Sequence, residues 1–295
     1  MSKSVGIIGL GNMGAGMANN LQGYLGAQGC ALDVFDIDPA KAAAIEGARV
    51  HTSAESLVAA CEVVLTSLPS AQEIALVAPA IFTAAKPGTI WLETSTNDLA
   101  QWQALRTQAP AYLTLIDAPI TGGFEGARDG TLTMLIGAEP DQITPLHHLL
   151  AAFTKQALVM GPSGAGYVTK LAQLHLNYLV AQGIGEALML GAKAGLAMDQ
   201  LHQVLMNSCA QSYVVDAYIP RVLDGSYDPS FALGLARKDM RLISGLGQHL
   251  GVDMELGDTV LRAYEDATER YGFDAPHLSV IKRIEDSAGM VLRQP

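Results

Sequence analysis

The stretch VGIIGLGNMGAGMANNL, residues 5–21, carries the pattern that decides the fold. An apolar run leads into three glycines with GxGxxG spacing, and a helix-like segment follows. Between a strand and a helix, the first glycine permits a tight turn, the second lets a pyrophosphate approach the backbone, and the third lets the helix pack on the strand. The helix N-terminus attracts the phosphates. This context predicts a dinucleotide-binding turn built from Gly9, Gly11, Asn12, Met13 and Gly14.

A second apolar run, ALDVFD, ends in Asp36, at the distance from the glycines where such folds hold the adenosine ribose. A carboxylate there accepts hydrogen bonds from both ribose hydroxyls and repels a 2′-phosphate. The next residues, Ile37 and Asp38, add no arginine. We therefore predict NAD rather than NADP as the cofactor; the alternative is that Asp36 only starts a turn. Asp33 is less suited to the ribose because it lies inside the expected strand.

From residue 4 to about residue 160, short β-rich runs alternate with amphipathic segments. Strand–helix–strand repetition predicts a mostly parallel, doubly wound α/β sheet of the Rossmann type. The expected strands are VGIIGL, ALDVFD, EVVLTSLP, GTIWLET, YLTLIDAP, TLTMLIG and ALVMG, and the expected helices include 39–46, 53–60, 97–107 and 140–152.

After GPSGAG at 161–166 the strand-like runs stop, and the remaining chain reads as helices. We place an NAD-binding domain at 1–162 and an all-helical substrate and oligomerisation domain at 163–295, joined by one long interdomain helix. Breaks between helices are expected near Gly195, Pro220 to Pro229, Gly251 and Gly272.

Composition limits the classes of partner. The chain has 295 residues, of which 49% are hydrophobic and 16% charged, so a sizeable core is expected. A net charge of -11 argues against nucleic acid and anionic membranes. The three cysteines form no CxxC pair and read as small buried residues of a protein in a reducing compartment. The histidines show no metal-ligand spacing, so no metal site is expected.

No export signal is visible at the start of the sequence. The longest apolar stretch, 176–192, contains Asn177, Gln182 and Glu186 and reads as a core helix rather than a membrane span. We expect a cytoplasmic protein.

Lys170 stands out within GAGYVTKLAQLHLN, residues 164–177. From Leu171 to Ala192 the only formal charge is Glu186, so the helix is apolar on nearly all sides and should be buried. A buried lysine costs free energy unless a partner or a reaction uses it. The alternative is a side chain that reaches from a core helix to solvent.

Three motifs resemble successive signatures of the β-hydroxyacid dehydrogenases: GLGNMG, DAPITGGFEGARDGTLTMLIG at 117–137 and GAGYVTK at 164–170. That family includes 3-hydroxyisobutyrate dehydrogenase and the tartronate semialdehyde and glyoxylate/succinic semialdehyde reductases, with 6-phosphogluconate dehydrogenase as a larger relative. SLP at 67–69, TST at 94–96 and ARKDM at 236–240 match as well, so the resemblance covers almost the whole chain.

The resemblance implies that Lys170 is the catalytic acid/base of an NAD-dependent dehydrogenase of a small 3-hydroxy acid. The lysine would remove the hydroxyl proton as hydride leaves, or return a proton in the reverse direction. Desolvation can bring the pKa of a buried lysine toward the working pH, and such proton transfer is worth roughly two to four orders of magnitude in rate. The resemblance also implies a homodimer or homotetramer with the second domain at the interface.

The substrate residues implied by the resemblance depart from the family pattern at two positions. The glycines of TGG at 121–123 would hold the substrate carboxylate, but Thr121 replaces the usual serine before Gly122 and Gly123. Leu174 stands where the family has an asparagine one turn after the lysine. Asn177, two turns from Lys170 on roughly the same face, is a possible substitute. Phe231 is expected to wall the pocket.

Further cofactor contacts are implied at the ends of other strands and in the helical domain. Ser95 and Thr96 would contact the nicotinamide ribose or the substrate, although a helix N-cap role is compatible with their position. Lys238 would reach the nicotinamide end or the substrate carboxylate, with Asp239 as its orienting partner or a support for the helix. Leu68 and Pro69 would line the cofactor cleft, and Glu93 is assigned no role.

Three alternatives stay open. An imine reductase or reductive aminase would share the architecture, but such enzymes usually lack the lysine. A catalytically silent NAD-binding or interaction protein is compatible with Leu174, although the intact Lys170 and TGG argue against it. A reductase of an unusual substrate, such as a sulfonated or aromatic aldehyde, would fit a pocket that Thr121 and Leu174 have made more apolar.

Overall fold

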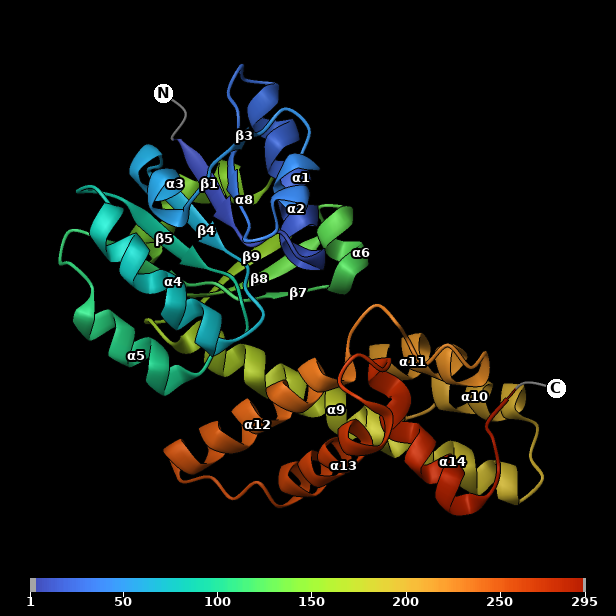
Figure 1. The fold of residues 1–295 in the computed structure, drawn as a ribbon. Coiled ribbons are helices and arrows are strands. Elements are labelled where there is room, and N and C mark those ends of the chain that lie inside the picture. The colour runs from blue at the N-terminus through green and yellow to red at the C-terminus, as the bar shows by residue number, and fades with distance from the viewer. Residues whose placement is uncertain (1–3, 294–295) are drawn as a thin grey trace. The chain divides into compact units, whose positions relative to one another are not determined.

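The computed structural model describes residues 4–293, and contacts divide the chain into two compact units, Met1–Lys170 and Leu171–Pro295. The first unit is an α/β sheet with helices, and the second is helical (Figure 1). The division falls inside the long helix α9 (Ala165–Lys193), beyond the predicted boundary at 162, because the first turn of that helix packs on the sheet.

The first unit is built on a nine-stranded sheet, which confirms the predicted Rossmann-type architecture. In spatial order the strands are β3 (Arg49–Val50), β2 (Asp33–Phe35), β1 (Val5–Ile8), β4 (Val63–Thr66), β5 (Ile90–Glu93), β6 (Thr114–Asp117), β8 (Leu132–Gly137) and β7 (Ile120–Thr121), and β9 (Thr154–Gly161) pairs with β8. The pairs from β3 to β6 are parallel, and so is the pair β8 with β9, whereas β8 runs antiparallel to β6 and β7. The two-residue strands β3 and β7 were not predicted because they are too short to show a pattern.

Helices cover both faces of this sheet. Successive strand residues point to opposite faces, so Val63 and Leu65 join one core cluster while Val64 joins the other. The first cluster lies under α1 (Asn12–Gly26), α2 (Pro39–Ala43) and α6 (Gly123–Arg128), and the second under α3 (Ala54–Ala60), α4 (Ala71–Ala84) and α5 (Leu99–Gln108).

The single helix predicted at 140–152 is wrong. The segment folds as α7 (Pro140–Ile143), a 3-10 turn η1 (Thr144–Leu146) and α8 (His147–Leu150). Pro145 explains the break, because it has no N–H to continue the α-helical hydrogen bonds.

In the second unit, three predicted helix breaks are confirmed at Gly195, Gly251 and Gly272, all with positive φ. The break predicted near Pro220 to Pro229 is also confirmed, since α11 (Tyr213–Leu223) ends before Asp224. Pro220 itself lies inside α11, whose last turn is buried in the helical core. None of the helices described in residues 4–293 is long and apolar enough to cross a membrane. After α9 come α10 (Met198–Met206), α11 (Tyr213–Leu223), α12 (Leu233–Leu250), α13 (Glu255–Tyr271), η2 (His277–Ile281) and α14 (Lys282–Ala288).

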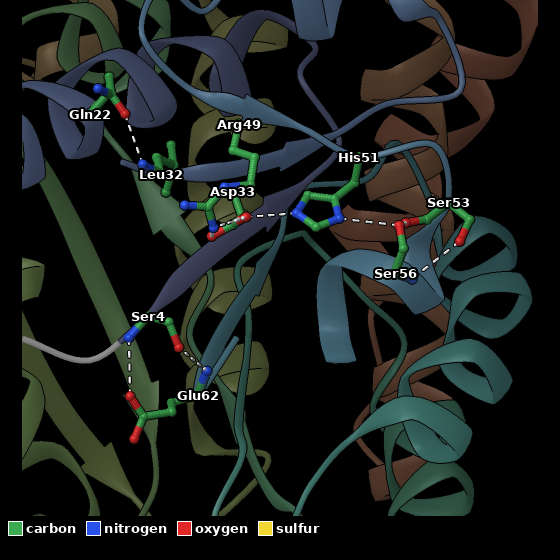
Figure 2. A network of polar contacts seen from close by, with 9 residues as sticks. All are labelled: Ser4, Gln22, Leu32, Asp33, Arg49, His51, Ser53, Ser56 and Glu62. Carbon is green, nitrogen blue, oxygen red and sulfur yellow. Dashed lines mark hydrogen bonds and ion pairs between the residues drawn. The ribbon is translucent and has the colours of Figure 1, made fainter. Parts of the chain in front are cut away.

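Asp33 belongs to the structure of the sheet rather than to a ligand site. It is the first residue of β2 and is 1% exposed. Figure 2 shows its carboxylate between Arg49 and the His51 ring, with His51 Nε2 2.6 Å from Asp33 Oδ1 and Nδ1 3.1 Å from the hydroxyl of Ser56. These bonds join β2 to β3 and α3 at the amino end of the parallel strands.

Candidate functional site at the carboxyl edge of the sheet

The strand order reverses between β1 and β4, since β2 lies on one side of β1 and β4 on the other. In open α/β sheets, ligands bind beyond the carboxyl ends of the strands at such a point. The residues in register along this edge are Ile8, Thr66, Glu93 and Asp117. The glycine turn follows directly after Ile8.

The glycine turn has the backbone that its motif predicts. Gly9 adopts φ +90°, a conformation that a side chain disfavours, and its N–H donates to Phe35 O over 3.0 Å. A Cβ on Gly14 would overlap the carbonyl oxygen of Gly9, so α1 packs tightly on the turn. Gly11 has open space where a Cβ would point and is exposed, as is Asn12. The turn therefore presents free backbone surface at the N-terminus of α1, which fits a pyrophosphate.

A groove of about 370 Å³ lies beside this turn. Leu10, Gly11 and Asn12 line one part of it, and Lys41 and Arg128 add two cations. Sequence reasoning missed both cations, because Lys41 lies in α2 and Arg128 in α6, and only the fold brings those helices to the turn. Within the part of the chain that the structure describes, no group of three or more His, Cys, Asp and Glu side chains is arranged to hold a metal ion.

Asp36 lies just beyond β2 and faces the glycine turn. Its Oδ2 accepts a hydrogen bond from the backbone N–H of Leu10 over 2.6 Å, and its Oδ1 accepts one from Asp38 N–H over 2.8 Å. The predicted alternative, a turn with Asp38, is therefore also observed. This turn does not exclude a role of Asp36 in binding the ribose, because the same carboxylate also contacts the glycine turn at Leu10 N–H.

Ser95 and Thr96 follow β5, but neither caps the helix after it. The N-cap of α5 is Asp98, whose side chain accepts the N–H of Gln101 over 2.7 Å, so the N-cap alternative for Ser95 and Thr96 is wrong. The Ser95 hydroxyl accepts the Leu68 N–H over 2.8 Å, which ties the ends of β4 and β5. Contacts of Ser95, Thr96 and Leu68 with a cofactor stay predictions, as do those of Pro69, which is exposed.

The TGG segment forms the end of β7 and the start of α6. Thr121 pairs with Thr133 of β8, and the next two residues, Gly122 and Gly123, have φ of +130° and +67°. Both glycines are exposed, and only residues without a Cβ adopt such a pair of conformations readily. The backbone here is thus open to a ligand, and a carboxylate-binding role stays a prediction.

Lys170 lies in the second turn of α9 and is 8% exposed, so burial of this lysine is confirmed. The first turn of α9 is bonded to a carboxylate at the sheet edge. Asp117 Oδ1 accepts Gly164 N–H over 2.7 Å, and Oδ2 accepts Gly166 N–H over 2.9 Å. The lysine therefore stands about one helical turn from the carboxyl edge of β6.

A second buried carboxylate reaches the same turn. Glu93 Oε2 accepts the hydroxyl of Tyr167 over 2.5 Å, and Oε1 accepts the N–H of Ser95 over 3.0 Å. Burial raises the pKa of Glu93, and burial together with the charge of Glu93 raises the pKa of Tyr167 well above its ordinary value. Sequence reasoning gave neither Glu93 nor Asp117 a role. The available signal was that both end neighbouring strands at the ligand-binding edge.

The remaining candidates belong to the helical unit. Leu174 is 8% exposed in its core, while Asn177 Oδ1 accepts the hydroxyl of Tyr218 over 3.1 Å. The Phe231 ring packs against His277 with centroids 5.8 Å apart. Lys238 Nζ lies 3.0 Å from Asp239 Oδ1, so Asp239 pairs with the lysine as one of its predicted roles requires.

Comparison with known proteins identifies two family models. Residues 4–161 match the NAD binding domain of 6-phosphogluconate dehydrogenase, and residues 164–284 match the NAD-binding domain of NADP-dependent 3-hydroxyisobutyrate dehydrogenase. The NAD-dependent L-serine dehydrogenase of Pseudomonas aeruginosa is 31% identical, over 96% of this chain and 98% of that protein.

Solved structures have the same fold. The 3-hydroxyisobutyrate dehydrogenase of Mycobacterium tuberculosis, solved with L-serine, superposes with a TM-score of 0.87 at 25% identity, covering 96% of this chain and 99% of that one. An imine reductase from Myxococcus stipitatus, solved with NAD+, has a TM-score of 0.64 at 14% identity, covering 96% and 99% of the two chains. The latter likeness concerns the fold alone.

Proposed function

The chain belongs to the β-hydroxyacid dehydrogenase family, and we propose that it is an NAD-dependent dehydrogenase of a small 3-hydroxy acid, with a semialdehyde or oxo acid as the oxidised product. The observation that carries the proposal is the buried Lys170, whose helix starts at the carboxyl edge of the sheet that also bears the glycine turn.

NAD fits the residues at that edge. The open face of Gly11 and the N-terminus of α1 would hold the pyrophosphate, and Lys41 and Arg128 would add positive charge beside it. Asp36 would accept the ribose hydroxyls. When bound, NAD supplies the acceptor for a hydride. The chain's own groups supply everything else, namely binding, orientation and proton transfer.

Lys170 takes the part of general base in alcohol oxidation and of general acid in the reverse direction. A neutral amine at its Nζ removes the hydroxyl proton of the substrate, and the resulting ammonium returns a proton when the carbonyl is reduced. The exposed backbone of Gly122 and Gly123 would receive the substrate carboxylate. Thr121 would line the same end of the pocket.

In the helical unit, Leu174 and Asn177 follow Lys170 on α9, one and two turns away. Leu174 would present an apolar surface to the substrate where relatives present an amide. Phe231 and Lys238 are proposed as a pocket wall and a contact for the cofactor or the carboxylate. A cytoplasmic location and assembly into a homodimer or homotetramer complete the proposal.

An assay panel tests this function. The enzyme would be incubated with 3-hydroxyisobutyrate, L-serine and related 3-hydroxy acids, and in reverse with semialdehydes and with aromatic and sulfonated aldehydes, using NAD and NADP in parallel. We expect NAD-dependent turnover of at least one 3-hydroxy acid. An enzyme that reduces cyclic imines but oxidises no hydroxy acid would instead be an imine reductase. A protein that binds NAD without any turnover would be a silent member of the family.

A further inference from the structure

We propose that Asp117 is a positioning residue for Lys170, with Glu93 as a second anchor on the same helical turn. The two carboxylates accept hydrogen bonds from residues 163–167. They thereby fix the backbone from which the Lys170 side chain extends toward the substrate. The inference rests on the proposed role of Lys170 and extends it to residues that do not touch the substrate.

Asp117 accepts hydrogen bonds from the residues just before α9 and from its first turn. Oδ1 accepts the N–H of Gly164 over 2.7 Å and the hydroxyl of Ser163 over 3.1 Å. Oδ2 accepts the N–H of Gly166 over 2.9 Å and lies 3.4 Å from the N of Tyr167. The carboxylate is fully buried at the end of β6, and this burial raises the pKa of Asp117, while the hydrogen bonds from Gly164 N–H and the Ser163 hydroxyl act in the opposite direction and favour the ionised form.

This arrangement requires both carboxylate oxygens to be acceptors. An asparagine amide has the same shape but only one acceptor oxygen, so its NH2 group would face backbone N–H groups on the other side. The start of α9 would have to shift or lose hydrogen bonds, and a buried group left unsatisfied is costly.

The glycines around Asp117 show that the contact is built into the fold. A Cβ on Gly166 would lie 2.5 Å from Leu135 O and 2.8 Å from Asp117 Oδ2, and a Cβ on Gly137 would overlap the Asp117 carboxylate. Gly164 adopts φ +97°, which lets the chain turn into the helix directly above the carboxylate. The two glycines before Lys170 thus serve the close approach of α9 to Asp117.

Glu93 holds the same turn through a side chain. It bonds the hydroxyl of Tyr167, and the Tyr167 ring packs edge-on against Trp102 with centroids 5.5 Å apart. The Trp102 ring also packs against Trp91, with centroids 5.6 Å apart, and its indole N–H donates to the hydroxyl of Ser163 over 3.0 Å. Residue 167 is therefore fixed at both backbone and side chain, and Lys170 follows it within one turn of a continuous helix.

The consequence for catalysis is quantitative. A reacting group must sit within about 0.5 Å of its productive position, and a displacement near 1 Å costs about 100-fold in rate. Asp117→Asn should therefore lower kcat by about 10- to 100-fold, while the KM for NAD, which depends on the turn before α1, stays within a few-fold. Tyr167→Phe removes the hydroxyl that bonds Glu93 and should lower kcat a few-fold.

Asp33→Asn is the matched control. It makes the same chemical change at an equally buried aspartate of the same unit, but at the amino end of β2 and away from α9. Each variant would be compared with wild type well below its melting temperature, using the best substrate of the panel with and without deuterium on its carbinol carbon. The isotope effect on kcat should rise in Asp117→Asn, because the chemical step becomes slower than product release. It should stay unchanged in Asp33→Asn.

Hydrogen–deuterium exchange gives a readout that does not depend on turnover. Amides of residues 164–170 should exchange faster in Asp117→Asn than in wild type or Asp33→Asn. The positioning role is overturned if exchange there is unchanged, or if Asp117→Asn and Tyr167→Phe keep the wild-type kcat and isotope effect. Failure of the proposed function would look different: Lys170→Met would remain active, or wild type would lack turnover, whatever the exchange rates show.

Discussion

The Asp36 carboxylate accepts the backbone N–H of Leu10 over 2.6 Å, and this bond joins the acidic end of β2 to the glycine turn. The two features that the sequence offers for dinucleotide binding are thus in direct contact in the folded chain. A ligand at the turn meets a carboxylate whose second oxygen is already held by Asp38 N–H over 2.8 Å. The acid is fixed in place before any cofactor arrives.

This geometry predicts a preference for NAD over NADP, because a fixed carboxylate repels a 2′-phosphate. Replacing Asp36 with Ser and Ile37 with Arg should move the ratio of kcat/KM toward NADP by at least tenfold, equivalent to about 1.4 kcal/mol. Asp38→Ser is the control and should leave the ratio near its wild-type value. Better use of NADP than NAD by the native enzyme would contradict the role of Asp36, and would point to Lys41 and Arg128 as phosphate ligands.

Lys170→Met should lower turnover by roughly two to four orders of magnitude, the usual contribution of general acid/base transfer. NAD affinity, measured by calorimetry, should stay within a few-fold because the glycine turn is untouched. Lys193→Met, in the last turn of the same helix, is the control, since that lysine bonds Ala288 O over 2.6 Å at the opposite end. Turnover that persists in Lys170→Met would assign the proton transfer to another group.

Leu174→Asn should reduce turnover of the best native substrate. Leu174 is buried, and an unpaired amide in an apolar pocket costs about 1–3 kcal/mol. Leu196→Asn, at an exposed leucine just after α9, should have little effect. Faster turnover in Leu174→Asn would mean that the leucine had merely cost the enzyme a substrate contact.

Asn177 provides the companion experiment. Its carbonyl oxygen is held by the Tyr218 hydroxyl, which orients the amide. If this amide replaces the missing asparagine, Asn177→Ala should raise the KM for substrate, and Tyr218→Phe should produce part of the same effect. A KM unchanged in both variants would limit Asn177 to a structural role.

Assembly is predicted from the exposed face of α9. Leu176 and Leu190 are 63% and 73% exposed and lie about four turns apart on one face, with Gly183 between them. Sedimentation should therefore show a mass above the 31.0 kDa of one chain. Leu176→Asp combined with Leu190→Asp should shift the protein toward monomer, whereas Leu76→Asp, at an exposed leucine of α4, should not. A wild-type monomer at micromolar concentration would exclude this interface.

The cysteines should differ sharply in reactivity. Burial, and then the charge of Asp33, raises the pKa of Cys61 to about 12, so almost no thiolate forms near neutral pH. Cys209 is exposed and Cys30 is half-buried, which corrects the expectation that all three cysteines are buried. Iodoacetamide at pH 8 should label Cys209 first and reach Cys61 only on unfolding, as mass spectrometry of digests would show. Equal labelling rates of Cys61 and Cys209 in the folded protein would contradict the predicted difference in reactivity.

Local chemistry explains what could be predicted from the sequence by itself. The strand, turn and helix at residues 5–26, and the helix ends at Gly195 and Gly251, depend on apolar periodicity and on the φ angles that glycine permits. These are properties of neighbouring residues, so they can be read along the chain. Packing overrides local preference at Pro220, which lies inside α11 although proline disfavours a helix interior. The error at Pro145 is different: the proline interrupts a segment expected to be one helix, because its missing N–H outweighs the apolar periodicity around it.

Lys170 could be singled out from the sequence, whereas Asp117 and Glu93 could not be connected with it. Lys170 and Glu186 are the only formal charges from Ala165 to Ala192, and the lysine is conspicuous in the sequence because burying an amine is costly wherever the helix ends up. Asp117 lies 47 positions from Gly164, and Glu93 lies 74 positions from Tyr167. Only the order of strands in the sheet puts β5 and β6 side by side beneath the start of α9. Hydrogen bonds between such distant residues leave no periodic trace, so the tertiary structure alone decided which carboxylates bond the turn that precedes the lysine.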